Sequence, residues 1–154
     1  MGMKLQTPLS DIDYLIDEMT ENVQNALVSV LTDVGLQCVR EARDSGSYMD
    51  QTGNLRSSIG FVVTREGRIE EKCLSDGVGD GKAVTKEGVA KSDALLSRLA
   101  ASYQQDVSLI VAAGMDYAVY VEGMGKNVLT SASLLADRLI PQMLTNLGIA
   151  SRKR

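Results

Sequence analysis

The segment over 76–82, Asp-Gly-Val-Gly-Asp-Gly-Lys, has the residue types of two kinds of ligand-binding loop. A phosphate loop requires Gly at its first position and Ser or Thr after its lysine, but Asp76 and Ala83 stand there. An EF-hand calcium loop is matched at its first, fifth, sixth and twelfth positions by Asp76, Asp80, Gly81 and Glu87. Val78 nevertheless occupies a ligand position, and the preceding segment has the pattern of a strand rather than of a helix. We therefore predict a flexible solvated loop over 75–92, with a small ligand- or calcium-binding module as the alternative function.

Nucleophilic and acid–base catalysis have few candidates in this chain. Ser57 and Ser58 have hydroxyl groups, but the chain has no His, and no Lys or carboxylate is spaced to act as their base. Glu70 and Glu71 are adjacent on a predicted strand and so point to opposite faces, and Glu122 lies far away in the sequence. The prediction is a protein that is not an enzyme and has no catalytic residues.

Cysteines, charge and hydropathy exclude further classes of site. Cys38 and Cys73 fall in apolar patterns without CxxC spacing, so both are predicted to be small core residues, with no zinc site and no cofactor. The net charge of -4 argues against binding to specific nucleic acid, because only Arg152-Lys153-Arg154 forms a basic cluster. No apolar run approaches the ~20 residues that cross a bilayer, and no signal-peptide pattern is present, so no membrane partner is expected.

A long amphipathic helix over 10–42 is the strongest structural prediction. Its apolar residues recur at steps of three and four: Ile12, Leu15, Ile16, Met19, Val23, Leu27, Val30, Leu31, Val34, Cys38 and Val39. A helix of ~32 residues is about 48 Å long, whereas a compact chain of this length is about 40 Å across. One end of the helix therefore projects and finds a partner, or the helix breaks at Gly35.

The rest of the chain predicts a small antiparallel sheet and two further helices. The predicted strands are 59–64, 69–74 and 107–113, with a hairpin turn at Glu66-Gly67, and 117–122 is a strand or one helical turn. Helices are predicted over 93–105 and 131–147, with Pro141 expected to kink or divide the second, and the tail over 148–154 is expected to be frayed. The predicted fold is α+β, with the N-terminal helix packed on the sheet and a C-terminal helix, in a single domain over 1–154.

Two short segments carry a resemblance to a known family. The first is Asp50-Gln51-Thr52-Gly53-Asn54-Leu55-Arg56-Ser57-Ser58-Ile59, and the second is Asp116-Tyr117-Ala118-Val119-Tyr120-Val121-Glu122-Gly123-Met124-Gly125. In their order, their spacing and the helix at each end they resemble the small tail-component and tail-completion proteins of tailed bacteriophages. The chain departs from that pattern after Gly123, where Met124-Gly125-Lys126 stands in place of Gly-Thr and a Pro-flanked aromatic segment.

The resemblance implies a structural protein of a phage or prophage particle. Its copies would form a homo-oligomeric ring at the neck that joins the head to the tail, contacting other neck or tail proteins, in the virion and, during assembly, in the host cytoplasm. The interface residues it implies are Asp50, Thr52, Gly53, Leu55, Arg56, Tyr117, Tyr120, Glu122, Gly123 and Gly125. For Tyr117 and Tyr120, contact with a partner and capping of the protein's own core remain equal alternatives.

Overall fold

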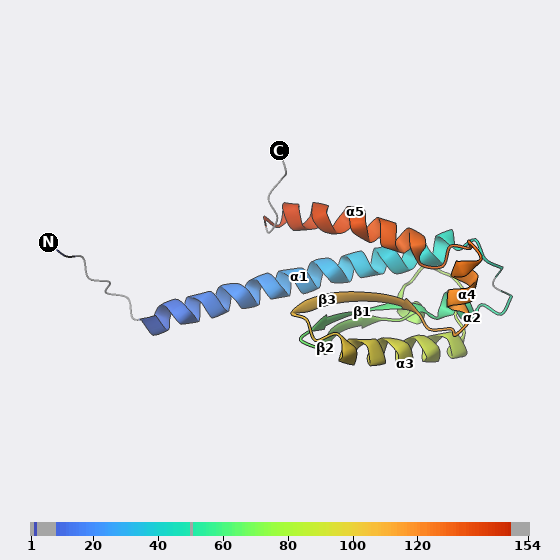
Figure 1. Ribbon diagram of the computed structural model, residues 1–154, viewed down its shortest axis with the longest axis horizontal. Helices are drawn as coiled ribbons and strands as arrows, with labels where there is room; N and C mark the ends of the chain where they lie inside the picture. Colours follow the sequence, from blue (N-terminus) through green and yellow to red (C-terminus); the bar gives the residue numbers. More distant parts are fainter. Residues whose placement is uncertain (1, 3–8, 50, 149–154) are drawn as a thin grey trace.

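The computed structural model describes residue 2, residues 9–49 and residues 51–148 of the 154-residue chain. It has an α+β fold with a long N-terminal helix, a three-stranded antiparallel sheet and a C-terminal helix, as predicted (Figure 1). Its elements are α1 (Leu9–Ser45), α2 (Asn54–Ser57), β1 (Ile59–Arg65), β2 (Arg68–Cys73), the 3-10 turn η1 (Ser75–Gly77), α3 (Lys86–Ser102), β3 (Val107–Ala113), α4 (Ala118–Gly123) and α5 (Thr130–Asn146). Within the described residues, no helix is both long enough and apolar enough to traverse a bilayer.

The sheet has the strand order β2-β1-β3, with both pairs antiparallel. The predicted turn at Glu66 and Gly67 joins β1 to β2, and both residues have positive φ, 51° and 80°, as a tight two-residue hairpin turn requires. A register shift at Val63 and Thr64 interrupts the β1–β2 ladder. The strand order makes β1 the central strand, and its residues Ile59 to Thr64 are buried.

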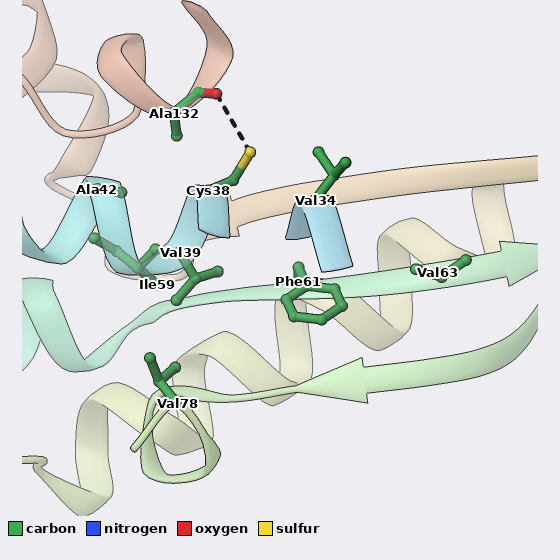
Figure 2. Packing of buried hydrophobic residues seen from close by; sticks show 9 residues of the cluster. All are labelled: Val34, Cys38, Val39, Ala42, Ile59, Phe61, Val63, Val78 and Ala132. Carbon is green, nitrogen blue, oxygen red and sulfur yellow. Dashed lines mark hydrogen bonds between the residues drawn. The ribbon is translucent and has the colours of Figure 1, made fainter. Parts of the chain in front are cut away.

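Helices cover the two faces of the sheet (Figure 1). Because side chains alternate along a strand, Phe61 and Val63 pack against α1, whereas Val62 packs in a separate cluster with Leu96 and Ala100 of α3. α5 lies along the C-terminal half of α1, and Cys38 of α1 donates a hydrogen bond to the carbonyl of Ala132 in α5 at 3.4 Å (Figure 2). The layers are thus α5, α1, the sheet and α3.

Gly35 does not break α1, which continues to Ser45. A Cβ at Gly35 would lie 2.6–2.9 Å from ring carbons of Phe61, well inside van der Waals contact. The glycine lets the helix backbone approach the aromatic ring of the central strand, and this close packing outweighs the low helix propensity of Gly. The first of the two predicted outcomes, a projecting end, is therefore the one observed.

The N-terminal part of α1 extends beyond the sheet (Figure 1). No described residue of α1 before Val34 is buried. Arg65 at the end of β1 contacts α1 where this helix leaves the sheet, donating hydrogen bonds to Glu21 at 3.3 Å and to Asn25 at 2.6 Å. We call residues Leu9–Val23 the arm.

The loop predicted over 75–92 is shorter than expected, because η1 occupies its start and α3 begins at Lys86. Thr85 caps α3 by accepting a hydrogen bond from the Gly88 amide at 3.2 Å. Gly88 and Ser92, which face the interior, are small, and a Cβ at Gly88 would meet Ser57 at 2.5 Å. The first turns of α3 pack through small residues, so they lack the apolar periodicity that reveals a helix in sequence.

Two other predicted boundaries change. The helix predicted over 93–105 ends at Ser102, and α5 continues through Pro141 as one element instead of dividing there. Pro141 is exposed, so its ring faces away from the core. Within the segment over 117–122, Tyr117 is the N-cap and the remaining residues form most of α4. The predicted tail after Gly148 lies outside the described residues.

Candidate assembly site

The fold brings the two family-like segments together at one end of the sheet, where α2 and α4 lie (Figure 1). Leu55 of the first segment and Ala118 of the second belong to one buried cluster. The other buried members of this cluster are Tyr48, Met115 and Val128. Asp50, the first residue of the predicted interface set, lies outside the described residues.

The first segment is mostly structural. Gly53 has a φ of 76°, which a side chain rarely tolerates, and it makes the turn into α2. Leu55 is only 3% exposed, so it belongs to the core of the subunit and is not available to a partner. Thr52 is exposed, and its hydroxyl oxygen lies 3.3 Å from the amide of Asn54. Of these three residues, Thr52 alone presents its side chain to solvent.

The two serines of this segment fix the backbone around α2. The Ser57 hydroxyl accepts a hydrogen bond from the Thr85 amide at 2.9 Å, and the Ser58 hydroxyl donates to the Leu55 carbonyl at 2.8 Å. Ser58 also accepts from the Met115 amide at 3.3 Å, which joins α2 to the segment before α4. Both side chains are buried and bonded to backbone groups, an arrangement that positions elements rather than a reacting atom.

Arg56 faces the cluster from α2. Its guanidinium carbon lies 5.9 Å from the centroid of the Tyr48 ring, within the range of a cation–π contact. Its carbonyl accepts a hydrogen bond from Arg43 at 2.9 Å. Arg56 therefore connects the end of α1 to the candidate site.

The second segment presents exposed apolar side chains on and beside α4. We call Tyr117, Val119, Tyr120 and Met124 the α4 patch. Tyr120 is 75% exposed, so it does not cap the core, whereas Tyr117 is 40% exposed and lines a groove of about 410 Å³ shared with Thr52 and Asn54 of the first segment. The groove shows that the two segments form one continuous surface.

Glu122 has a structural role that sequence reasoning missed. Its carboxylate accepts hydrogen bonds from the amides of Val128 at 2.8 Å, Leu129 at 3.0 Å and Thr130 at 3.2 Å, and from the Thr130 hydroxyl. Burial raises the pKa of Glu122, but the hydrogen bonds from Thr130 and from the backbone amides outweigh it and hold the pKa below its ordinary value. The carboxylate thus satisfies the amide of Thr130, where α5 begins, and the two amides before it, and is already engaged within the subunit.

The glycines after α4 differ from each other. Gly125 has a φ of 75°, so a side chain there is strained, whereas Gly123 has no neighbouring atom within 4 Å of a Cβ position. Gly125 is required by the backbone. Gly123 has no such requirement within the subunit.

The predicted calcium-loop carboxylates do not converge. Asp80 binds Arg43, and Glu87 accepts a hydrogen bond from Asn54 at 2.8 Å. Across residues 9–49 and 51–148, no group of three or more His, Cys, Asp or Glu side chains could hold a metal ion. Glu70 likewise pairs with Arg65, at 3.5 Å, on the β2 side of the sheet.

A buried ion pair anchors the glycine-rich loop. Arg43 is fully buried, and its guanidinium contacts the Asp80 carboxylate at 2.6 Å and 3.1 Å. Hydrogen bonding from Arg43 lowers the pKa of Asp80, although burial acts in the opposite direction. Lys82 donates to the Arg43 carbonyl at 2.9 Å and pairs with Asp44, so this part of the predicted flexible loop is tied to the end of α1.

Both cysteines are free thiols; Cys38 lies in the core, as predicted, and Cys73 packs against it. Cys38 is buried and Cys73 half-buried, and burial raises the pKa of both thiols. Their surroundings therefore favour the neutral, unreactive form.

Comparison with known proteins gives no relative: no family model, no curated protein and no solved structure matches this chain. The assignment of the candidate site therefore rests on its geometry and on the two family-like segments of the sequence.

Proposed function

We propose that this chain is a structural protein of a phage or prophage particle, acting in the head–tail neck or tail through ring assembly and protein–protein contacts. The observation that carries the proposal is the α4 patch, because its apolar and aromatic side chains are exposed and its Tyr117 shares a groove with the first family-like segment. Tyr and Met are enriched at protein interfaces, and Tyr brings a large contact area at low entropic cost.

The shape of the subunit is consistent with this proposal. The arm forms one end of α1, and α4, which carries the patch, lies near the other end of that helix (Figure 1). A subunit with separate contact surfaces at its two ends can bind neighbours head to tail, and such contacts close into rings when the rotation between neighbours permits. The partners under this proposal are further copies and other neck or tail proteins.

Deletion of the gene in a lysogen that carries it tests the proposal. The expected result after induction is separate heads and tails in electron micrographs, with infectivity restored by the wild-type gene on a plasmid. Release of normal infectious particles by the deletion strain would refute the proposed function.

Two tyrosine variants locate the contact. Tyr120→Ser, in the α4 patch, is expected to fail in complementation because it removes an exposed aromatic contact. Tyr103→Ser is the matched control, since Tyr103 is also exposed, at 49%, but lies outside both family-like segments. Both variants should fold normally by circular dichroism, and equal complementation by both would exclude the α4 patch as the contact surface.

A further inference from the structure

The apolar side chains of the arm form a stripe with coiled-coil spacing. Alternate steps of three and four residues separate Leu9, Ile12, Ile16, Met19 and Val23 of the arm, and a further step of three reaches Ala26 just beyond it. Side chains repeated in this way lie on one helix face and pack as knobs into the holes of a second helix. Ile16 is 55% exposed and Met19 67% exposed, so the stripe is open to solvent in the isolated subunit.

The charges of the arm avoid this stripe. Counting Leu9, Ile16 and Val23 as the first heptad position, four of the acidic residues fall on outer positions, and these are Asp11, Asp17, Glu18 and Glu21. The positions that flank the stripe hold Asp13, Leu15, Thr20 and Asn22, of which only Asp13 is charged. Two copies of the arm can therefore pack together without opposing carboxylates, whereas a basic partner helix would find almost no acidic group beside the seam.

A groove continues the stripe toward the sheet. α1 forms one wall of this groove and the start of β3 the other, with a volume of about 560 Å³. Its lining includes Ile16, Met19, Val23, Leu27, Asp106 and Val107. A helix seated on the stripe would fill the groove only if it extended as far as Val107.

We infer that the arm pairs with the arm of a second copy as a short antiparallel coiled coil. In this arrangement Ile16 faces Met19 of the second copy, Ile12 faces Val23, and Leu9 faces Ala26. The small side chain of Ala26 leaves space for Leu9, and the tip of the second arm then reaches the groove beside Leu27 and Val107. A parallel pair would instead place Leu9 against Leu9 and Ala26 against Ala26, and would lack this match of a large side chain with a small one.

The two-fold pair describes the free protein. A two-fold contact closes on itself and does not propagate around a ring. Pairing would cover the apolar stripe of the arm until contacts in the particle replace it. This role of the pair, as the form that precedes assembly, rests on the proposed function.

Sedimentation velocity of the full chain over a range of concentrations tests the pairing. The expected result is a reversible monomer–dimer equilibrium. Met19→Asp should weaken the dimer by about 100-fold or more, because it places an unpaired charge in the seam. Tyr14→Asp is the matched control: Tyr14 is similarly exposed, at 68%, but lies at an outer heptad position, so the dimer should persist.

Two outcomes of that experiment would overturn the inference: a protein that remains monomeric at all concentrations, or a dimer that Met19→Asp leaves unchanged. In the second case another surface, or the chain after Gly148, makes the contact. Circular dichroism of each variant shows whether the subunit itself stays folded.

Disulfide trapping tests the direction of the pair. In a background with Cys38→Ala and Cys73→Ala, a mixture of Ile16→Cys and Met19→Cys chains should form a mixed disulfide dimer upon oxidation. Each variant alone should form little. A dominant disulfide in the Ile16→Cys sample alone would show parallel arms and overturn the antiparallel arrangement.

Failure of the pairing and failure of the proposed function are distinguishable. A monomeric protein whose gene deletion still separates heads from tails removes the pairing and leaves the proposed function. A dimer that dissociates with Met19→Asp, together with normal particles from the deletion strain, removes the proposed function and leaves the pairing.

Discussion

Arg43 is the residue on which the end of α1, α2 and the glycine-rich loop depend together. Its guanidinium binds the Asp80 carboxylate and the Arg56 carbonyl from a fully buried position. A buried arginine is tolerated only when its charge is paired and its donors are bonded. The Arg43–Asp80 pair holds the end of α1, the glycine-rich loop and α2 in position beside the candidate site.

Asp80→Asn removes the charge opposite Arg43. We expect a loss of about 3 kcal/mol in the free energy of unfolding, because a buried guanidinium is left without its counterion. Urea denaturation followed by circular dichroism measures this loss. Asp76→Asn in the same loop is the control, since Asp76 is exposed, and its unfolding midpoint should not change.

The same pair predicts an acid-dependent loss of stability. The pKa of Asp80 is lowered in the folded protein, so its contribution is fully present above the pKa of the unfolded carboxyl, about 4, and is lost as pH falls through the folded value. Wild type should therefore lose stability below about pH 4 more steeply than Asp80→Asn. Parallel pH profiles for the two proteins would contradict this assignment.

Glu122→Ala removes the carboxylate that accepts hydrogen bonds from three amides at and just before the start of α5. The expected cost is about 1–2 kcal/mol of unfolding free energy, the range typical of a lost helix cap. Glu122→Gln keeps one acceptor oxygen and should cost less. Glu71→Ala, at an exposed carboxylate of β2, is the control, and an equal effect at both positions would show that Glu122 does not act as a cap.

These residue-scale roles could be predicted from sequence only in part. The apolar spacing of Cys38 and Val39 predicted their burial, and both lie in the core. From the sequence, Arg43 is simply a cation near the C-terminus of a helix. Its burial depends on pairing with Asp80, which lies 37 residues away in the chain. The sequence signal that could have indicated this burial is the position of Arg43 on the same helix face as the buried Val39.

At the scale of elements, the contact between α1 and β1 depends on Gly35. Gly35→Ala would raise helix propensity by about 1 kcal/mol. It would also place a Cβ within 2.6–2.9 Å of the Phe61 ring, so we expect a net loss of about 1–3 kcal/mol in unfolding free energy. Chemical denaturation measures the sign, and a stabilised variant would show that the ring moves freely.

Two further variants test the cause of that loss. Gly35→Ala combined with Phe61→Leu should be less destabilised than the sum of the single changes, because the smaller side chain makes room for the new methyl group. Gly123→Ala is the control helix glycine: with no atom within 4 Å of its Cβ position, it should leave stability unchanged or slightly higher.

Periodicity predicted the elements well where apolar residues face the core. α1, β3 and most of α5 follow that rule, whereas the start of α3 does not, because Gly88 and Ser92 occupy its inward positions. Small inward residues allow close packing and give no hydrophobic pattern. The length of the loop before α3 could therefore not be predicted from the sequence.

At the scale of the whole molecule, the comparison of helix length with domain size predicted a projecting or broken helix. The structure has the projecting form, with its sheet between α1 and α3 (Figure 1). The meeting of the two family-like segments at one end of the sheet depends on how β1 and β3 pair, since each segment adjoins one end of a strand in that pair. Strand pairing is a tertiary property that neither segment specifies alone.

Hydrogen exchange should divide α1 into two parts. At protein concentrations where the subunit is monomeric, the amides of residues 13–20 are expected to exchange through local opening of the arm, because it lacks buried contacts. The amides over 34–43 should exchange only through much larger openings, since this part of α1 is packed against the sheet and α5. Mass spectrometry of peptides from both regions measures the difference. Raising the protein concentration should slow exchange in the arm of wild type but not of Met19→Asp, and uniform protection along α1 in the dilute monomer would mean that the arm folds back onto the subunit.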